Sequence, residues 1–374
     1  GSVMLWYTDK DNNSLYEISI GSENGSVEAN TNGSGMFAYL DNISTLDLSG
    51  LDTSNMTSMS KMFYKSKSLT NIDLSGFDTS KVVNMNGMFT GCTNLKGLNL
   101  SNFKTSKVTD MNNMFADCSS LTTLDLSNFD TSNVLYMGNP YSYSYGGMFR
   151  NCSSLVSLNI SSFNTSKVKQ MSNMFQGCSS LVTLDLSNFD TSNVTAMASM
   201  FTNCTNLKNL NLSSFNTSKV TDMNAMFMNC KSLSDLNLSS FDTSSVQTFK
   251  QMFYTCSSLV NLDLSSFDTS NAISMWHMFS GSSNLETLDL SNFTTSKLET
   301  TYFMFYNCSK LKTIYVSNEW VTTSLKTSNG MFTNCSSLIG TSPEGITTKY
   351  DSSKIDASMA NYTNGYLTYK KNTN

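Results

Sequence analysis

The chain is dominated by an internal repeat of 26 residues. A Met-Phe pair marks each copy, and the interval between pairs is 26 residues except at two places. The marker phenylalanines are Phe37, Phe63, Phe89, Phe115, Phe149, Phe175, Phe201, Phe227, Phe253, Phe279, Phe305 and Phe332. Phe149 follows Phe115 by 34 residues, an insertion of eight, and Phe332 follows Phe305 by 27. Such a repeat predicts a stack of similar units, each burying its apolar side only against its neighbours.

Each unit contains two periodicities. The segment "LTTLDL" places Leu124 and Leu126 on one side of a predicted strand and Asp125 on the other. The apolar residues of the preceding marker segment, Val108, Met111, Met114 and Phe115, lie three, three and one positions apart. This spacing fits one face of a short helix, and the preceding "DTS" or "NTS" offers Thr and Ser as its N-cap. We therefore predict an α/β solenoid with one parallel β-strand and one short helical segment per coil.

The "DTS/NTS" corner occurs in two alternating versions. Consecutive repeats begin this corner with Asp130, Asn164, Asp190, Asn216 and Asp242, and three residues later they carry Asn133, Lys167, Asn193, Lys219 and Ser245. Strands in a sheet lie about 4.8 Å apart, so identical corners would stack like charges. Unit charges about 4 Å apart repel by about 1 kcal/mol even in water. The alternation removes this repulsion, and duplication of a two-repeat unit explains the pattern equally well.

Nine cysteines occupy one position of the repeat. They are Cys92, Cys118, Cys152, Cys178, Cys204, Cys230, Cys256, Cys308 and Cys335, with Ser66 and Ser282 at the same position elsewhere. No CxxC pair exists and no histidine lies nearby in the sequence, which argues against a zinc site. We expect a column of buried free thiols and no bound metal.

Composition excludes two classes of partner. The chain is 39% hydrophobic and 14% charged, too apolar for a disordered chain, and its net charge is −5. An acidic chain lacks the basic face that phosphate contacts need, so we expect no nucleic-acid partner. No run of 18 apolar residues occurs, so we expect no membrane insertion. The Gly1-Ser2 start is typical of an expression remnant, which places targeting and anchoring segments outside this sequence.

The repeat and the tail resemble one known family. "LDLSNFDTSNVTAMASMFTNCTNL", residues 184–207, resembles the repeat of about 26 residues in BspA-like bacterial surface proteins. "YDSSKIDASMANYTNGYLTYK", residues 350–370, is similar to the segment that follows their last repeat. The resemblance implies a right-handed leucine-rich-repeat-type solenoid that is extracellular and attached to the cell surface or cell wall, often with a role in adhesion or host contact. It implies no particular ligand. The chain differs from the family pattern in its 34-residue unit and in the absence of a visible wall-anchoring signal.

The expected organisation has three parts. Residues 1–35 are predicted to form an N-terminal hairpin cap that covers an open sheet edge. The segments "VMLWY" and "LYEISI" are its two expected strands. Residues 36–340 form the solenoid of about 11 coils, with the insertion at 138–145. Residues 341–374 form a C-terminal cap.

Catalysis finds little support in the sequence. An outward column contains Asp47, Asp73, Asp125, Asp185, Asp263 and Asp289, and paired carboxylates can act as acid and base. A column that repeats through the whole chain indicates a scaffold, because a catalytic site needs a distinctive constellation. We predict no catalytic residue and no cofactor.

Binding residues are expected where the repetition fails. The insertion supplies Tyr141, Tyr143 and Tyr145, with Tyr136 before it and Arg150 after it. Tyr and Arg frequently anchor interfaces, although a tolerated surface insertion explains the same residues. Trp276 and His277 stand where most repeats have small or polar residues, and they are candidates for stacking on a sugar or a partner, or on neighbouring side chains.

Three functions remain open from the sequence. The first is an adhesion or interaction module that binds a host or bacterial surface protein or glycan. The second is a passive spacer or stalk of a larger surface protein. The third is a polysaccharide-active enzyme, which the sequence favours least because no catalytic constellation is visible.

Overall fold

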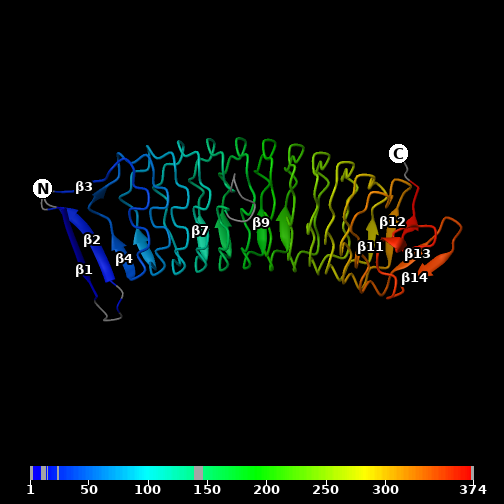
Figure 1. The fold of residues 1–374 in the computed structure, drawn as a ribbon. Helices are drawn as coiled ribbons and strands as arrows, with labels where there is room; N and C mark the ends of the chain where they lie inside the picture. The colour runs from blue at the N-terminus through cyan, green and yellow to red at the C-terminus, as the bar shows by residue number, and fades with distance from the viewer. Residues whose placement is uncertain (1–2, 10–13, 15, 23–24, 139–145, 372–374) are drawn as a thin grey trace. The chain divides into compact units, whose positions relative to one another are not determined.

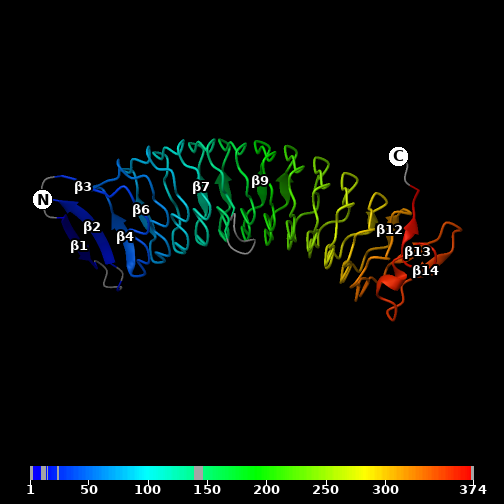
Figure 2. The same cartoon turned by 45° about the horizontal axis from the view of Figure 1, so that its top comes forward.

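The chain forms two compact units, residues 1–181 and residues 182–374. The computed structural model describes residues 3–9, 14, 16–22, 25–138 and 146–371. Each unit is a β-solenoid of stacked coils, in which equivalent segments of successive repeats lie side by side (Figures 1 and 2). Below, "first unit" and "second unit" refer to these two ranges.

The first unit contains eight described strands. They are β1 (Val3–Thr8), β2 (Tyr16–Ser22), β3 (Val27–Glu28), β4 (Ile43–Asp47), β5 (Leu51–Asp52), β6 (Asn71–Asp73), β7 (Thr123–Asp125) and β8 (Ser157–Asn159). β1 and β2 pair antiparallel, and β2, β4 and β6 continue the same sheet in parallel. β3 pairs with β5, and β7 with β8, also in parallel. The antiparallel pair therefore lies against the first parallel strand of the stack.

The second unit contains seven described strands and one short 3₁₀ helix. They are β9 (Thr183–Asp185), β10 (Asn209–Asn211), β11 (Thr287–Asp289), β12 (Thr313–Val316), β13 (Ile339–Thr341), β14 (Thr347–Lys349), η1 (Ala357–Met359) and β15 (Thr368–Tyr369). β9 and β10 form one parallel pair, and the other five strands form one sheet in the order β11-β12-β15-β13-β14. Near its C-terminus the chain thus returns to insert β15 between β12 and β13.

Strand pairing follows the repeat. Leu124 of β7 lies opposite Leu158 of β8, and Leu184 of β9 lies opposite Leu210 of β10. A second column of parallel bridges joins Asp110 to Tyr136 and Tyr136 to Gln170, so the register survives the eight-residue insertion. The predicted stack of parallel strands is confirmed. The division into 1–35, 36–340 and 341–374 stays a prediction.

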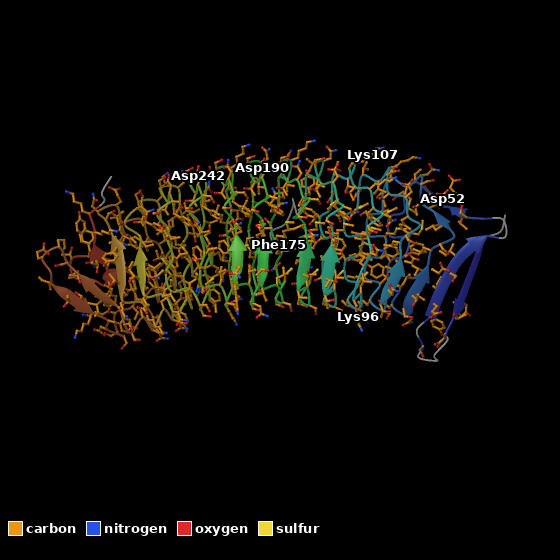
Figure 3. The ribbon with its side chains drawn as sticks, turned by 180° about the vertical axis from the view of Figure 1, so that it is seen from behind. Asp52, Lys96, Lys107, Phe175, Asp190 and Asp242 are labelled. Atoms are coloured by element: carbon orange, nitrogen blue, oxygen red, sulfur yellow. The ribbon has the colours of Figure 1, made fainter. Side chains whose placement is uncertain are left out.

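The core consists of side-chain columns. Leu121, Leu124 and Leu126 are buried while Asp125 is exposed, as the strand pattern predicts. The marker phenylalanines stack face to face, with ring centroids 5.4 to 5.8 Å apart from Phe37 to Phe175 in the first unit. From Phe201 to Phe332 in the second unit the spacing is 5.6 to 5.7 Å. Phe175 lies inside the stack in Figure 3.

The predicted helical segment is wrong, and with it the α/β class. The only helix in the described residues is η1, and the marker segments are successive turns. Within one such segment, Met62 N–H donates to the Met59 carbonyl in its own coil, 3.2 Å, whereas Phe63 N–H donates to Met88 of the next coil, 2.8 Å. Because alternate N–H groups leave the coil, the continuous i to i−4 bonding of a helix cannot form.

Left-handed residues produce this alternation. Lys61 and Lys65 have φ of 55° and 56°, and Asn113 and Asp117 hold the equivalent positions with φ of 59° and 60°. The N–H of Lys65 donates to Thr90 of the next coil, 2.6 Å. Two left-handed residues four positions apart turn the backbone away from the right-handed helix, which also explains why Val108, Met111, Met114 and Phe115 are buried without one.

The predicted Thr and Ser N-caps have different partners from those expected. The hydroxyl of Thr217 donates to the Asp242 carbonyl of the next coil, 2.7 Å, and accepts from the Asp242 N–H, 2.9 Å. The short-range acceptor is instead the acid or amide at the corner, since Ser132 N–H donates to Asp130 Oδ1, 3.0 Å. The buried Thr column therefore joins one coil to the next.

The cysteine column is confirmed as nine buried free thiols. The thiols donate to phenylalanine carbonyls of the preceding coil, as Cys92 does to Phe63, 3.1 Å. Ser66 makes the same bond to Phe37, 2.6 Å. Burial raises the pKa of Cys92 to about 12. The column is thus a row of hydrogen-bond donors in which Cys and Ser replace one another.

The alternating corner is joined by hydrogen bonds. Lys167 Nζ donates to Asn133 Oδ1, 2.7 Å, and Lys219 Nζ donates to Asn193 Oδ1, 2.8 Å. In the second unit Asp190 and Asp242 lie along one edge, and in the first unit Asp52 and Lys107 do so (Figure 3). Each lysine with such a bond meets a neutral amide of the preceding coil, which avoids a stack of like charges.

The C-terminal segment packs on the last coils of the second unit. Tyr366 is fully buried, and its ring meets Phe332 edge-on at 5.4 Å. The indole N–H of Trp320 donates to the Ala360 carbonyl, 3.2 Å, so Trp320 has a packing role.

Removing the Thr217 hydroxyl should destabilise the second unit. Thr217→Val keeps the shape but leaves the Asp242 N–H without its acceptor and the Asp242 carbonyl without this donor, a loss of about 1–3 kcal/mol. Thr217→Ser keeps the hydroxyl and should lose less. Urea denaturation measures both variants, and hydrogen exchange at the Asp242 amide should accelerate in Thr217→Val. Equal stability of Thr217→Val and the parent would contradict a structural role for this column.

Candidate functional site

Gly138 and Gly147 lie near the two ends of the insertion, each close to the backbone of the next coil. Gly147 has φ of 156°, and a Cβ there would clash with the Asn173 carbonyl of the next coil. Met148 N–H donates to the Met137 carbonyl, 2.8 Å, which joins the two ends of the insertion. The backbone of Tyr136 forms parallel β-bridges with Asp110 of the preceding coil and Gln170 of the next coil. Three predicted site residues, Tyr141, Tyr143 and Tyr145, lie outside the described residues.

Arg150 is held by the preceding coil. Its guanidinium donates to Asp117 Oδ2, 2.6 Å, and Asn151 Nδ2 donates to Asp117 Oδ1, 2.8 Å. The Arg150 side chain is 19% exposed. Arg150 is therefore an ion-paired residue at the edge of the insertion, and its paired guanidinium is less available to a partner than the sequence suggested.

Trp276 and His277 belong to a larger aromatic cluster. The cluster consists of Tyr254, Trp276, His277, Tyr302 and Phe303, all half-buried. His277 lies at its centre, with ring centroids 5.7 Å from Tyr254, 5.1 Å from Trp276, 5.9 Å from Tyr302 and 5.2 Å from Phe303. The two predicted residues are thus brought together, but they stack on neighbouring side chains as well as facing solvent.

A lysine covers one face of the indole. Lys250 Nζ lies 3.9 Å from the Trp276 ring centroid, within the range of a cation–π contact. Lys250, Trp276 and Tyr302 occupy one repeat position in three successive coils, whereas Asn112, Ser172 and Ala198 hold it elsewhere. Sequence reasoning missed Lys250, Tyr302 and Phe303, although comparing this position and the next one in successive repeats would have placed them beside Trp276 and His277.

Two cluster residues have an unfavourable backbone conformation. His277 has φ of 55° and Phe303 has φ of 51°. The equivalent positions in other coils hold Gly35, Lys61, Gly87, Asn113, Gly147, Asn173, Ser199, Ala225, Gln251 and Gly330. Gly and Asn adopt this conformation most readily, and an aromatic residue there is strained by the order of 1 kcal/mol or more.

The pKa of His277 is lowered, first by burial and then by the charge of Lys250. Its Nδ1 is buried and has no hydrogen-bond partner among the described residues. Both observations favour the neutral imidazole. The five residues of the cluster therefore form a neutral aromatic surface, and the cation Lys250 lies over its Trp276 ring.

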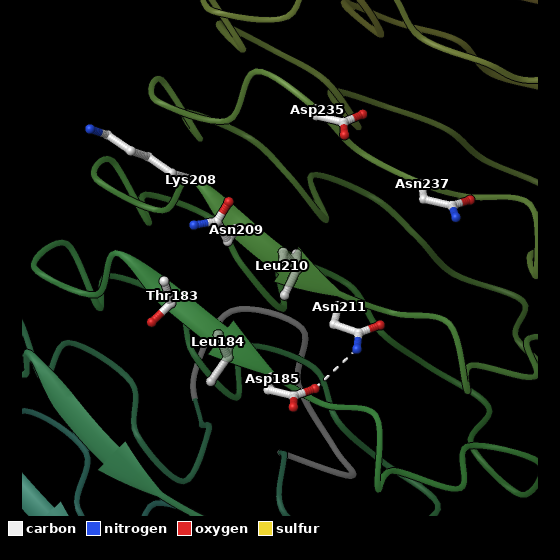
Figure 4. A pocket seen from close by; sticks show the side chains of 9 residues that line it. All are labelled: Thr183, Leu184, Asp185, Lys208, Asn209, Leu210, Asn211, Asp235 and Asn237. Atoms are coloured by element: carbon white, nitrogen blue, oxygen red, sulfur yellow. Dashed lines mark hydrogen bonds between the residues drawn. The ribbon is translucent and has the colours of Figure 1, made fainter.

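The polar face of the sheet forms a hollow in the second unit. Figure 4 shows it between β9 and β10 and the following coil, with a volume of about 490 Å³. Asn211 Nδ2 donates to Asp185 Oδ1, 3.2 Å. The hydrogen bond from the Ser187 N–H is the main reason that the pKa of Asp185 is lowered. A general acid needs a raised pKa, so this carboxylate suits turn formation better than proton donation.

The described part of the chain contains no group of three His, Cys, Asp or Glu side chains placed to hold a metal ion. No helix there is long and apolar enough to span a bilayer.

Three overlapping stretches, residues 31–146, 143–259 and 230–342, match the family model described as "Mycoplasma protein of unknown function, DUF285". The chain belongs to this family. The family match and the 26-residue stack confirm the resemblance to BspA-like bacterial repeat proteins that the sequence indicated. No curated protein matches the chain.

Several solved structures are similar. A leucine-rich repeat protein from Bacteroides ovatus is 15% identical, with 86% of this chain and 97% of that chain covered and a TM-score of 0.39. A leucine-rich cell surface protein from Faecalibacterium prausnitzii is 15% identical, with coverages of 90% and 94% and a TM-score of 0.43. An internalin from Listeria monocytogenes is 15% identical, with coverages of 84% and 86% and a TM-score of 0.23.

His277 should make stability depend on pH near neutrality. Its lowered folded pKa means that the unfolded chain binds the proton more readily, so stability falls as pH decreases below about 6.5 and levels off below the folded pKa. His277 is the single histidine of the chain. We expect the step in thermal stability between about pH 7 and pH 5 to diminish in His277→Asn. An unchanged step in this variant would show that another group causes it.

Proposed function

We propose that the chain is a non-catalytic interaction module of a bacterial cell surface, which binds a protein of a host or neighbouring cell through the aromatic cluster. The extracellular location rests on the BspA-like repeat and tail. The observation that carries the proposal is the pair of aromatic residues, His277 and Phe303, at left-handed backbone positions.

The backbone hydrogen bond of His277 does not require a histidine. Its backbone N–H donates to the Tyr302 carbonyl of the next coil, 3.0 Å, and any residue type would supply that bond. Asn at this position would keep the bond with less backbone strain, as Asn113 and Asn173 do. Strained residues that the scaffold does not require are concentrated at functional sites. Phe303 also fills space above Gly330, so His277 is the more informative of the two.

The geometry favours a protein over a neutral sugar as the partner. A sugar stacks on an open aromatic face, but Lys250 lies over one face of Trp276 and Tyr302 is tilted beside it with its centroid 6.4 Å away. Half-buried aromatic rings beside a cation are the side chains that anchor protein interfaces. The cluster thus offers a rigid contact that loses little conformational entropy on binding.

Arrays of extracellular-matrix proteins and of glycans test this function with the full chain. We expect binding to at least one protein, and we expect Trp276→Ser to weaken the measured Kd about tenfold or more. Ser is native at this position in other coils, at Ser60 and Ser172. Val260→Ser removes an exposed apolar side chain elsewhere in the second unit and should leave Kd unchanged.

Three outcomes would contradict the proposal. Protein binding that survives intact in Trp276→Ser excludes the cluster as the contact. Absence of binding to every array member supports the alternative of a passive spacer, and turnover of a polysaccharide supports an enzyme.

The insertion is a separate proposed contact, which belongs to the first unit. Replacing Tyr141, Tyr143 and Tyr145 together with Ala should weaken binding if the insertion takes part, because tyrosines supply large contacts with little loss of entropy. The same affinity measurement serves as the readout. Unchanged affinity in this triple variant would restrict the interface to the aromatic cluster.

A further inference from the structure

A basic groove lies along the marker turns of the first unit. It is a local excess of positive charge, because the net charge of the chain is −5. Its volume is about 510 Å³. Its charged lining residues are Lys61, Lys65, Lys67, Asp117 and Arg150. This groove lies in a different unit from the aromatic cluster, so nothing that follows depends on the proposed protein interaction.

Two glycines form part of the wall. Gly87 and Gly91 occupy the two left-handed positions of one coil, with φ of 62° and 75°. Other described coils carry a side chain at one or both of these positions, such as Lys61 and Lys65 before them and Asn113 and Asp117 after them. A Cβ at Gly91 would come within 3.1 Å of Lys65 Cγ, and one at Gly87 within 3.3 Å of Lys61 Cγ. The missing side chains therefore leave room for the lysine stems beside the backbone.

Three lysines remain available for a ligand. Asp117 is engaged by Arg150, so the one acid of the groove neutralises the one arginine. Lys61, Lys65 and Lys67 are exposed, and none of them has an ion pair within the described part of the chain. The groove consequently holds an excess of about three positive charges, counted from its ionised lining residues.

Aromatic rings adjoin the lysines. The ammonium groups of Lys61 and Lys65 lie 5.6 and 5.2 Å from the centroid of the Tyr64 ring. Tyr64 meets Tyr39 edge-on at 5.5 Å, and Tyr39 is 62% exposed. Tyr39 thus offers an aromatic side chain to solvent beside a cluster of positive charge.

The polar side chains of the groove are fixed. Thr90 Oγ1 donates to the Asn113 carbonyl, 2.6 Å, and Asn113 Oδ1 accepts from the Gly147 N–H, 3.1 Å. Asn86 Nδ2 donates to Asp110. Because these groups already have partners, the lysine ammonium groups are the principal free hydrogen-bond donors. Lysines act as mobile point charges, which suits separate monoanionic groups better than the paired oxygens that arginine grips.

We propose that this groove binds an anionic polysaccharide, whose carboxylate or sulfate groups contact Lys61, Lys65 and Lys67 while a sugar ring packs against the exposed Tyr39 ring. An acidic chain with one short basic groove is unsuited to the extended phosphate contacts of a nucleic acid. Sugar rings have apolar C–H faces that can pack on the exposed Tyr39 ring.

The test uses the full chain and defined polymers. Heparin represents a sulfated polysaccharide, polygalacturonate a carboxylated one, and dextran a neutral one. We expect binding to one or both acidic polymers and none to dextran. The affinity should fall as NaCl is raised from about 0.05 M to about 0.5 M, because exposed charges are screened.

Two variants separate the groove from general charge. Replacing Lys61, Lys65 and Lys67 together with Ala should weaken binding about tenfold or more. The matched control replaces Lys81, Lys107 and Lys167 with Ala, which removes the same charge from the corner of the first unit and should change affinity much less. Gly91→Asn leaves the charge unchanged, and Asn151 adopts the same conformation at the equivalent position. Its Cβ displaces the Lys65 stem, so this variant should also bind more weakly.

Three results would overturn the proposal. These are dextran binding as tight as that of the acidic polymers, equal losses in the groove and control variants, and no binding to either acidic polymer. Polyglutamate binding as tightly as the polysaccharides would assign the groove to acidic peptides instead. Trp276→Ser should bind the acidic polysaccharides normally, so failure here and failure of the proposed protein interaction are distinguishable.

Discussion

The structure depends on backbone N–H groups that leave their own coil. In each marker turn, alternate N–H groups bond within the turn and to the next coil, as Met62 and Phe63 do. Every coil therefore satisfies part of its polar backbone only when a neighbour is present. The stacked phenylalanines and the Thr and Cys columns follow from this arrangement, because bonding at every coil keeps equivalent side chains in register.

Sequence patterns predicted the columns but not the local backbone. Leu124, Leu126 and the cysteines were placed correctly, since burial and repeat length determine which letters stack. The helix was wrong because Val108, Met111, Met114 and Phe115 have helical spacing without helical bonding. The informative signal was the frequent Gly and Asn four positions apart on either side of Met-Phe, such as Asn173 and Gly177, which indicate left-handed residues. A segment this short also gains little from helix propagation.

The candidate sites were harder to foresee than the fold. Trp276 and His277 are unusual residue types at their repeat positions, so the sequence indicated them. Contacts of Trp276 in the structure come from Lys250 in the preceding coil and Tyr302 in the next coil. Arg150 stood out equally, yet its carboxylate partner Asp117 lies 33 residues away in sequence. Side-chain neighbours in a solenoid are one repeat apart, so a site is recognised only by comparing the same position in successive coils.

The nine thiols have a consequence for the chemistry that the chain tolerates. Thiolates, not thiols, react with oxidants, and burial raises the pKa of Cys152 to about 12, so the thiol form dominates at pH 7. Enclosure within the stack also keeps peroxides and disulfide reagents away from the sulfur atoms. A sequence with a cysteine in most repeats can thus persist in air and among other thiol proteins without cross-linking, and reducing agents should neither activate nor weaken it.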